Sequence, residues 1–225
     1  RQLRKLHSIV EQAYLPKGGL NRKFPKAILR GPTLYGGHGD PGLYTRKGYN
    51  QVQLMLGHIR NNDEQGDMIR LEVEALQMLA GTKDPIMEES TKVKWKLWVE
   101  DTWVKDVKIF LHTIKAGIKN FGQRQPKIQR KQDTFIMEYI PEEYQEDEAK
   151  QINRCRMYLR ALTVSDITTS DGTELDRGAL RGIRNVSYES VYNWSRQNTI
   201  YQQGWKEWKR FLLNSLCETG TNKLK

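Results

Sequence analysis

Apolar residues recur at every third or fourth position in several stretches of the chain, which is the spacing of a helix that buries one face. The first stretch covers residues 2–14, and a second helix is predicted over residues 45–61 with Thr45 as its N-cap. Asp63 stands where the N-cap of a third helix belongs, and Gly81 stands where that helix would take its C-terminal cap. The pattern therefore predicts three helices in this first part of the chain.

The same spacing predicts three more helices further along. The first of them opens at Asp101 or Thr102, carries an apolar stripe and closes at Gly117. Apolar residues at helical spacing then cover residues 146–162 behind an acidic start, and the last helix is predicted over residues 205–216.

Three other stretches lack helical spacing. Residues 31–43 hold seven glycines and prolines, which predicts a turn-forming loop. Residues 134–140 alternate between apolar and polar positions, and this segment and residues 163–167 are both predicted to form short strands. The expected fold is therefore mainly α: an irregular helical bundle with a Gly/Pro-rich loop and at most a few short strands.

Residues 119–132 are polar, basic and poor in core residues, so they are predicted to form an exposed linker. This linker divides the chain into two expected parts. Residues 1–118 would form a helical subdomain that contains the loop over 31–43, and residues 133–225 would form a C-terminal helical subdomain.

The composition excludes several classes of protein. Hydrophobic residues make up 37% and charged residues 28% of the 225 positions, which is ordinary for a globular chain. The apolar runs are far shorter than the roughly 20 residues that cross a bilayer, so no membrane partner is expected. Two cysteines, Cys155 and Cys217, are too few for a disulfide scaffold. These features predict an intracellular protein, nuclear or cytoplasmic, and the start at Arg1 predicts a piece of a longer one.

The positive charge changes this picture most. The formal net charge is +10, and residues 1–50 hold ten Lys/Arg against two Asp/Glu. Residues 91–135 hold eleven against four, whereas residues 51–90 and 136–150 are acidic. Clustered cations favour a polyanionic partner because they release counterions from phosphates together. RNA, DNA or an RNA–DNA hybrid is therefore the predicted partner, and a merely solubilising surface is the alternative.

The glycine-rich loop could bring backbone N–H groups close to a phosphate through Gly36, Gly37 and Gly39. It lacks both the Gly-Lys-Ser/Thr ending and the preceding apolar strand of nucleotide sites, so a structural loop is favoured over a nucleotide pocket. For the cations around it, contact with a phosphate backbone and a solvated face both remain open. The predicted nucleic-acid-binding residues, around the loop and in the linker, are Lys17, Arg22, Lys23, Lys26, Arg30, Arg46, Lys47, Lys119, Arg124, Lys127, Arg130 and Lys131.

No catalytic or metal-binding pattern stands out. The four histidines and two cysteines are scattered, and none has a partner at ligand spacing. Glu100 and Asp101 precede an apolar stripe. Acidic residues are common at this place because they interact favourably with the N-terminal end of the helix dipole. We therefore expect no catalytic residue, no metal, no cofactor and no small-molecule substrate in this chain.

The tryptophans lie in basic surroundings, where aromatic rings can stack on bases. Trp103, Trp205 and Trp208 fit an apolar stripe and are predicted to pack in the core. Trp95 and Trp98 lie outside such a stripe, so stacking and core packing are equally compatible with their positions.

A further set of residues resembles the region downstream of the polymerase domain in non-LTR (LINE-type) retrotransposon reverse transcriptases. That region carries a Gly-Gly-x-Gly motif, then Pro and Leu, then a helix rich in Gln and Leu. Later segments are similar to retroelement proteins of algae and other protists, namely 71–81, 152–159, 163–167 and the closing Trp205-x-x-Trp208. The counterparts of the motif and the helix are Gly36, Gly37, Gly39, Pro41, Leu43, Gln51, Gln53, Leu54 and Leu56.

Two residues depart from this motif, because His38 and Asp40 stand where it usually has apolar residues. The aspartates that catalyse polymerisation in this family lie upstream of the matching region. The resemblance thus implies a thumb and post-thumb region that grips a primer–template duplex beside an upstream polymerase domain of the same polypeptide. It implies no polymerase activity for this piece.

Two other classes stay open. A freestanding helical protein–protein interaction module would use the acidic segments 63–74 and 138–148 together with the basic ones. A metal-dependent nuclease would need carboxylates such as Asp63, Glu72 and Glu74 to converge on a metal.

Overall fold

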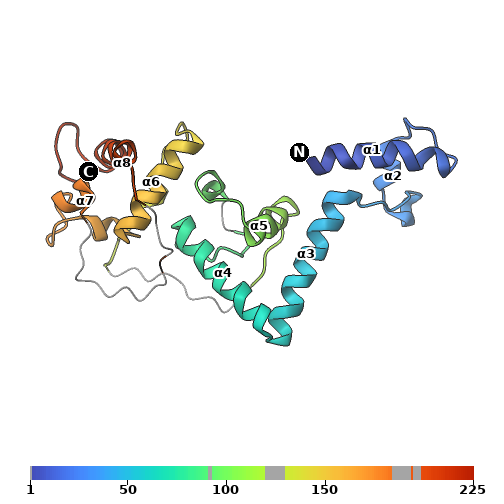
Figure 1. Cartoon of the computed structure of the whole chain (residues 1–225), viewed down its shortest axis with the longest axis horizontal. Helices are drawn as coiled ribbons and strands as arrows, with labels where there is room; N and C mark the ends of the chain where they lie inside the picture. Colours follow the sequence, from blue (N-terminus) through green and yellow to red (C-terminus); the bar gives the residue numbers. More distant parts are fainter. Residues whose placement is uncertain (1, 91–92, 120–129, 184–193, 195–198) are drawn as a thin grey trace. The chain divides into compact units, whose positions relative to one another are not determined.

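The computed structural model describes residues 2–90, 93–119, 130–183, 194 and 199–225 (Figure 1). Over these residues the chain forms α-helices and short 3₁₀ segments, and the only β-pairing consists of isolated bridges. The predicted mainly α fold is confirmed. No described helix has both the length and the apolar character that a membrane crossing requires.

The chain divides into two compact units, which we call unit 1 (Arg1–Gly66) and unit 2 (Asp67–Lys225). The sequence analysis placed the division at 119–132, and residues 120–129 of that segment lie outside the described part. Residues on both sides of the segment pack together in unit 2, because Arg156 donates to the Met78 carbonyl over 2.6 Å. The observed division therefore comes earlier, within the first turn of a helix.

Unit 1 begins with α1 (Gln2–Lys17), which packs against α3 (Gly42–Asn61). Between them lie the one-turn helix α2 (Lys26–Arg30), which the periodicity missed, and the 3₁₀ turn η1 (Thr33–Tyr35). Leu15 and Leu29 are buried between these elements.

Helix α3 begins at Gly42 rather than after the predicted cap Thr45. The Asp40 carboxylate accepts a hydrogen bond from the Gly42 N–H over 3.1 Å, so Asp40 satisfies a free amide at the helix start. Pro41 follows directly and is suited to a helix start because its ring fixes φ. The predicted start is therefore wrong by one turn.

Two predicted caps of α4 (Glu64–Ala80) are confirmed, one at each end of the helix. Asp63 accepts a hydrogen bond from the Gly66 N–H over 2.8 Å, as an N-cap does. At the other end Gly81 adopts φ 64°, the left-handed conformation of a C-terminal cap.

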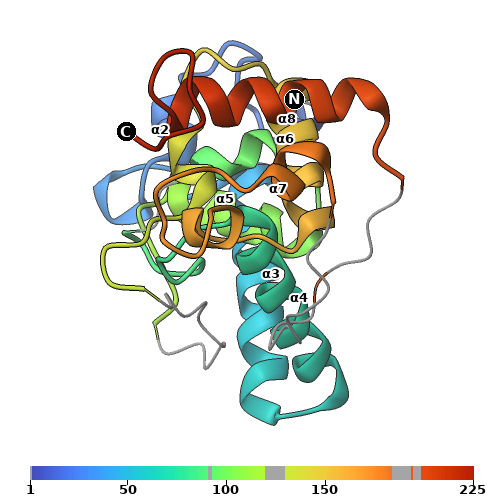
Figure 2. The same cartoon turned by 90° about the vertical axis from the view of Figure 1, so that its left-hand side faces the viewer.

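Unit 2 is built around α6 (Glu146–Leu159) and α8 (Gln202–Leu216), which pack along each other (Figures 1 and 2). Helix α7 (Arg177–Arg181) packs on α8, and the buried Trp208 indole donates to the Ala179 carbonyl over 3.0 Å. The remaining elements of unit 2 are η2 (Lys94–Leu97), α5 (Trp103–Thr113), η3 (Ile136–Tyr139) and η4 (Val164–Ile167). Thr102 caps α5 as predicted, but the helix ends at Thr113, before Gly117.

The two predicted strands are wrong. Residues 134–140 and 163–167 instead contain η3 and η4, and they meet through a single antiparallel bridge between Phe135 and Thr163. The backbone turns immediately after this bridge, because Glu138 N–H bonds back to the Phe135 carbonyl over 3.1 Å. The alternating pattern therefore reflects one bridge followed by a turn.

Candidate nucleic-acid interface

The seven predicted cations of unit 1 are all solvent-exposed. Lys17 ends α1, Arg22 and Lys23 lie in the turn before α2, Lys26 and Arg30 lie on α2, and Arg46 and Lys47 lie in the second turn of α3. The structure thus leaves each of these charged groups accessible to a partner.

Two of these cations also have a structural role. The carboxylate of buried Glu11 on α1 lies 3.1 Å from Arg30 Nη2 and 3.6 Å from Lys26 Nζ, and His7 Nε2 approaches it to 2.7 Å. Burial alone would raise the pKa of Glu11, but the Arg30 hydrogen bond and the charges of His7, Lys26 and Arg30 lower it below its usual value. Arg30 and Lys26 therefore tie α2 to α1, and part of their charge is compensated within the protein.

The backbone of the Gly-rich loop is already hydrogen-bonded internally. The N–H groups of Gly36 and Gly37 donate to the carbonyls of Thr33 and Pro32, each over 3.0 Å. Gly39 N–H likewise donates to the Gly31 carbonyl over 2.8 Å. These amides are committed to the loop, which supports the structural interpretation over a phosphate cradle.

One glycine of the loop is required by close contact. A Cβ atom on Gly37 would lie 2.1 Å from the Gly31 carbonyl oxygen, so only glycine fits at this crossing of the chain. The loop is thus closed by backbone against backbone, and its glycines serve this packing.

A groove of about 550 Å³ lies between α1, the loop and α3. Its apolar lining includes Leu15 and Leu29, and its polar lining includes Tyr14, Asp40 and Arg46. The Tyr14 hydroxyl donates to the Asp40 carboxylate over 2.8 Å. The pKa of Asp40 lies below its usual value. Burial alone would raise it, but the hydrogen bonds from the Gly42 N–H and the Tyr14 hydroxyl and the nearby positive charges lower it. The carboxylate is therefore held as an internal acceptor between α1 and the start of α3.

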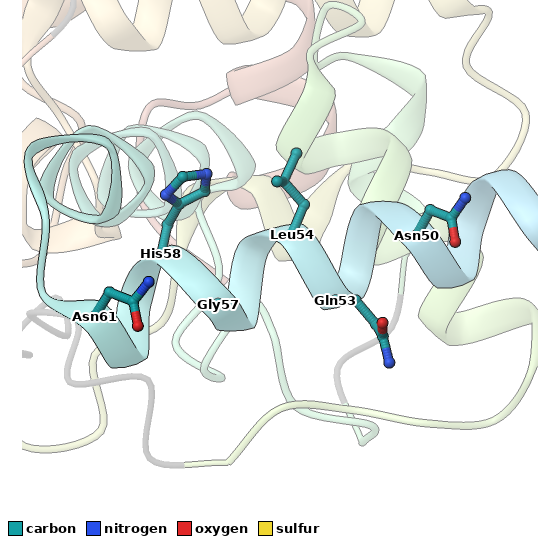
Figure 3. Close-up of a pocket in the computed structure, with 6 residues that line it drawn as sticks. All are labelled: Asn50, Gln53, Leu54, Gly57, His58 and Asn61. Carbon is teal, nitrogen blue, oxygen red and sulfur yellow. The ribbon is translucent and has the colours of Figure 1, made fainter.

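A neutral hollow of about 420 Å³ follows one face of α3 (Figure 3). Leu54 and His58 project to the same side of the helix, and Gln53 projects to the other. His58 Nδ1 lies 2.8 Å from the Asp63 carboxylate, so this imidazole is already engaged. Asn50 and Asn61 complete a lining that presents amides and no unpaired cation.

The second predicted basic surface is described only in part. Lys119, Arg130 and Lys131 are exposed, whereas Arg124 and Lys127 lie outside the described residues. Arg130 is close enough to the Ser170 carbonyl for a weak hydrogen bond of 3.4 Å.

Three cations in the described part of unit 2 are buried, and no pattern in the sequence predicts this. Lys105 and Lys108 on α5 donate to the carbonyls of Val99 and Glu88, and burial lowers the pKa of Lys108 to about 8. Arg156 on α6 is also fully buried. These groups hold backbone turns in place and are not available to a nucleic acid.

Trp95 and Trp98 belong to the core of unit 2, with exposed fractions of 2% and 5%. The Trp98 indole donates to the Ala80 carbonyl over 3.3 Å. This settles the question that the sequence left open, since neither ring is accessible to a base. Of the tryptophans predicted to pack in the core, Trp208 is fully buried, and Trp103 and Trp205 are half-buried.

Among the described residues no three His, Cys, Asp or Glu side chains gather closely enough to hold a metal ion. Comparisons with models of protein families, with curated proteins and with solved structures find no match. The resemblance to non-LTR reverse transcriptases therefore rests on its motif residues alone.

Proposed function

We propose that unit 1 binds the phosphate backbone of a nucleic-acid duplex, as the thumb-like part of a non-LTR retroelement reverse transcriptase does with its primer–template. The observation that carries this proposal is the concentration of charge. Residues 1–66 hold eleven Lys/Arg against four Asp/Glu, which is a surplus of seven out of the chain's ten. The predicted cations of this unit are exposed, so the surplus faces solvent.

The contact would be made by side chains rather than by backbone amides. Lys17, Arg22 and Lys23 are exposed and form no ion pair with other described residues, so their charges are uncompensated. Lys26 and Arg30 share the Glu11 carboxylate and would contribute less. Such contacts fix a protein on the backbone without specifying sequence.

The test is the dependence of affinity on salt. For five to seven phosphate contacts, the slope of log K against log salt is expected to be about −4.5 to −6.3, which is about 0.9 for each contact. The triple variant Lys17→Gln, Arg22→Gln, Lys23→Gln should flatten the slope by about 3, since each lost contact removes about 0.9.

The matched control is the triple variant Lys206→Gln, Lys209→Gln, Lys223→Gln. It removes the same charge from exposed positions of unit 2 and should leave the slope nearly unchanged. A salt-insensitive wild type, or an equal effect of both triple variants, would contradict the proposal.

A freestanding protein–protein interaction module is the second candidate, because α1 exposes the apolar side chains of Leu6, Ile9 and Val10. It predicts a defined oligomer in sedimentation and no duplex binding at low salt. The same wild-type titration therefore separates the two functions.

A further inference from the structure

The 3₁₀ turn η1 at the tip of the Gly-rich loop exposes two adjacent large apolar side chains. Leu34 is 84% and Tyr35 is 83% exposed. Neither residue is needed by the core of unit 1. Among the described residues, Tyr201 in unit 2 is the only other large apolar side chain with comparable exposure.

This exposure is not the result of a loose loop. The turn is closed on itself, because Tyr35 N–H and Gly37 N–H both donate to the Pro32 carbonyl over 3.0 Å. The base of the loop is closed by His38 N–H, which donates to the Ile28 carbonyl over 3.0 Å. The backbone from which the two side chains project is therefore already ordered, which lowers the entropy cost of binding through this turn.

The charge around the tip indicates what would cover it. Residues 12–39 contain five cations and no Asp or Glu. Glu11 compensates part of the charge of Lys26 and Arg30, but Lys17, Arg22 and Lys23 form no ion pair with other described residues, so the partner of this segment should be anionic. An anionic partner that also offers flat aromatic faces is a nucleic acid with unpaired bases, and a tyrosine ring stacks on any of the four bases. A paired duplex alone would not explain Tyr35, because its bases are already stacked.

We propose that Tyr35 stacks on an unpaired nucleobase next to the duplex, while Leu34 packs against the neighbouring base or sugar and the cations of unit 1 hold the flanking phosphates. This inference rests on the proposed function and adds to it a site for single-stranded nucleic acid. Apolar side chains beside a base step are a known way to hold bases out of a stack.

The experiment compares the full chain and its variants on two DNA duplexes, one blunt and one with a short single-stranded overhang that carries 2-aminopurine. Tyr35→Ala should weaken binding to the overhang duplex about tenfold to a hundredfold, the range that loss of base–aromatic stacking gives. It should also abolish the change in 2-aminopurine fluorescence, and binding to the blunt duplex should stay unchanged. Tyr35→Phe keeps the ring and should behave as wild type.

Tyr201→Ala is the matched control, because it removes the same side chain at the same exposure in unit 2. Tyr201→Ala should bind both duplexes with wild-type affinity and give the wild-type change in 2-aminopurine fluorescence. The Tyr35 side chain is largely in solvent, so the variants are expected to fold, and circular dichroism verifies this.

The outcomes separate the two proposals. If wild type binds both duplexes with steep salt dependence and Tyr35→Ala matches it on the overhang, the stacking site is refuted and the proposed function stands. If wild type binds neither duplex, both fail. An anionic membrane is the other surface that such a tip could enter. The wild type and Tyr35→Ala are therefore also tested on phosphatidylserine vesicles. If Tyr35→Ala loses vesicle binding but keeps wild-type binding to the overhang duplex, the stacking site is overturned in favour of a membrane contact.

Discussion

Lys108 provides a quantitative test of the packing in unit 2. It is fully buried on α5, and burial lowers its pKa from 10.5 to about 8 despite the opposing charges of Glu88 and Glu89. Because the unfolded chain keeps the higher pKa, it binds more protons than the folded chain between these values, and stability therefore rises with pH. The shift corresponds to a penalty of about 3 kcal/mol at neutral pH. About 1 kcal/mol of this penalty should be relieved between pH 7 and pH 9.

The perturbation is Lys108→Met, which keeps the length of the side chain and removes the titrating group. The rise in the free energy of unfolding between pH 7 and pH 9 should then disappear, as measured by urea unfolding at several pH values. Tryptophan fluorescence is a suitable signal, since all six tryptophans lie beyond residue 66 and report on unit 2. Lys206→Met, at an exposed position of α8, should keep the rise. A Lys108→Met protein with the same pH dependence as wild type would refute the reasoning.

Three further outcomes are expected from the packing. A Cβ on Gly57 meets no atom within 4 Å, so Gly57→Ala should stabilise α3 by about 0.5–1 kcal/mol in thermal melts followed at 222 nm. A Cβ on Gly66 would lie 2.4 Å from the His58 carbonyl oxygen, so Gly66→Ala should lower the stability by about 1–3 kcal/mol in the same melts. An unchanged melting midpoint would contradict this close contact between Gly66 and the α3 backbone. Burial raises the pKa of the Cys155 thiol to about 12, so it should resist iodoacetamide at pH 8 in the folded protein and react once urea unfolds it. Rapid labelling of the folded protein, followed by mass spectrometry, would show that this site opens.

The longer helices could be predicted from the sequence because each buries a stripe at regular spacing, and the caps at Asp63, Gly81 and Thr102 follow from local chemistry. The two one-turn helices α2 and α7 are too short to show a period. The strand predictions failed because Phe135, Ile136 and Met137 are consecutive buried residues around a bridge and a turn, so burial does not alternate from one residue to the next as it does in a half-buried strand.

The candidate site was only partly predictable. The cations of unit 1 are exposed as expected, since charged side chains on short turns reach solvent. The fate of the loop amides was not predictable, because the partners of His38 and Gly39 are carbonyls ten and eight residues earlier in the chain. The exposed pair Leu34 and Tyr35 had no signal in the periodicity, since a single turn has none.

The buried cations described above also bear on how a mutational scan of this protein should be interpreted. Lys105, Lys108 and Arg156 serve as internal donors to carbonyls, so replacing them by alanine would leave those acceptors unpaired and loosen unit 2. In an alanine scan of every Lys and Arg, substitutions at these positions would reduce nucleic-acid binding as strongly as substitutions of residues that contact the nucleic acid. A charge-preserving substitution distinguishes the two classes. Arg156→Lys should still loosen unit 2, because one ammonium cannot replace the separate bonds that the guanidinium makes to the Met78 and Ala161 carbonyls. At Arg22, in contrast, lysine keeps the charge that a phosphate would need.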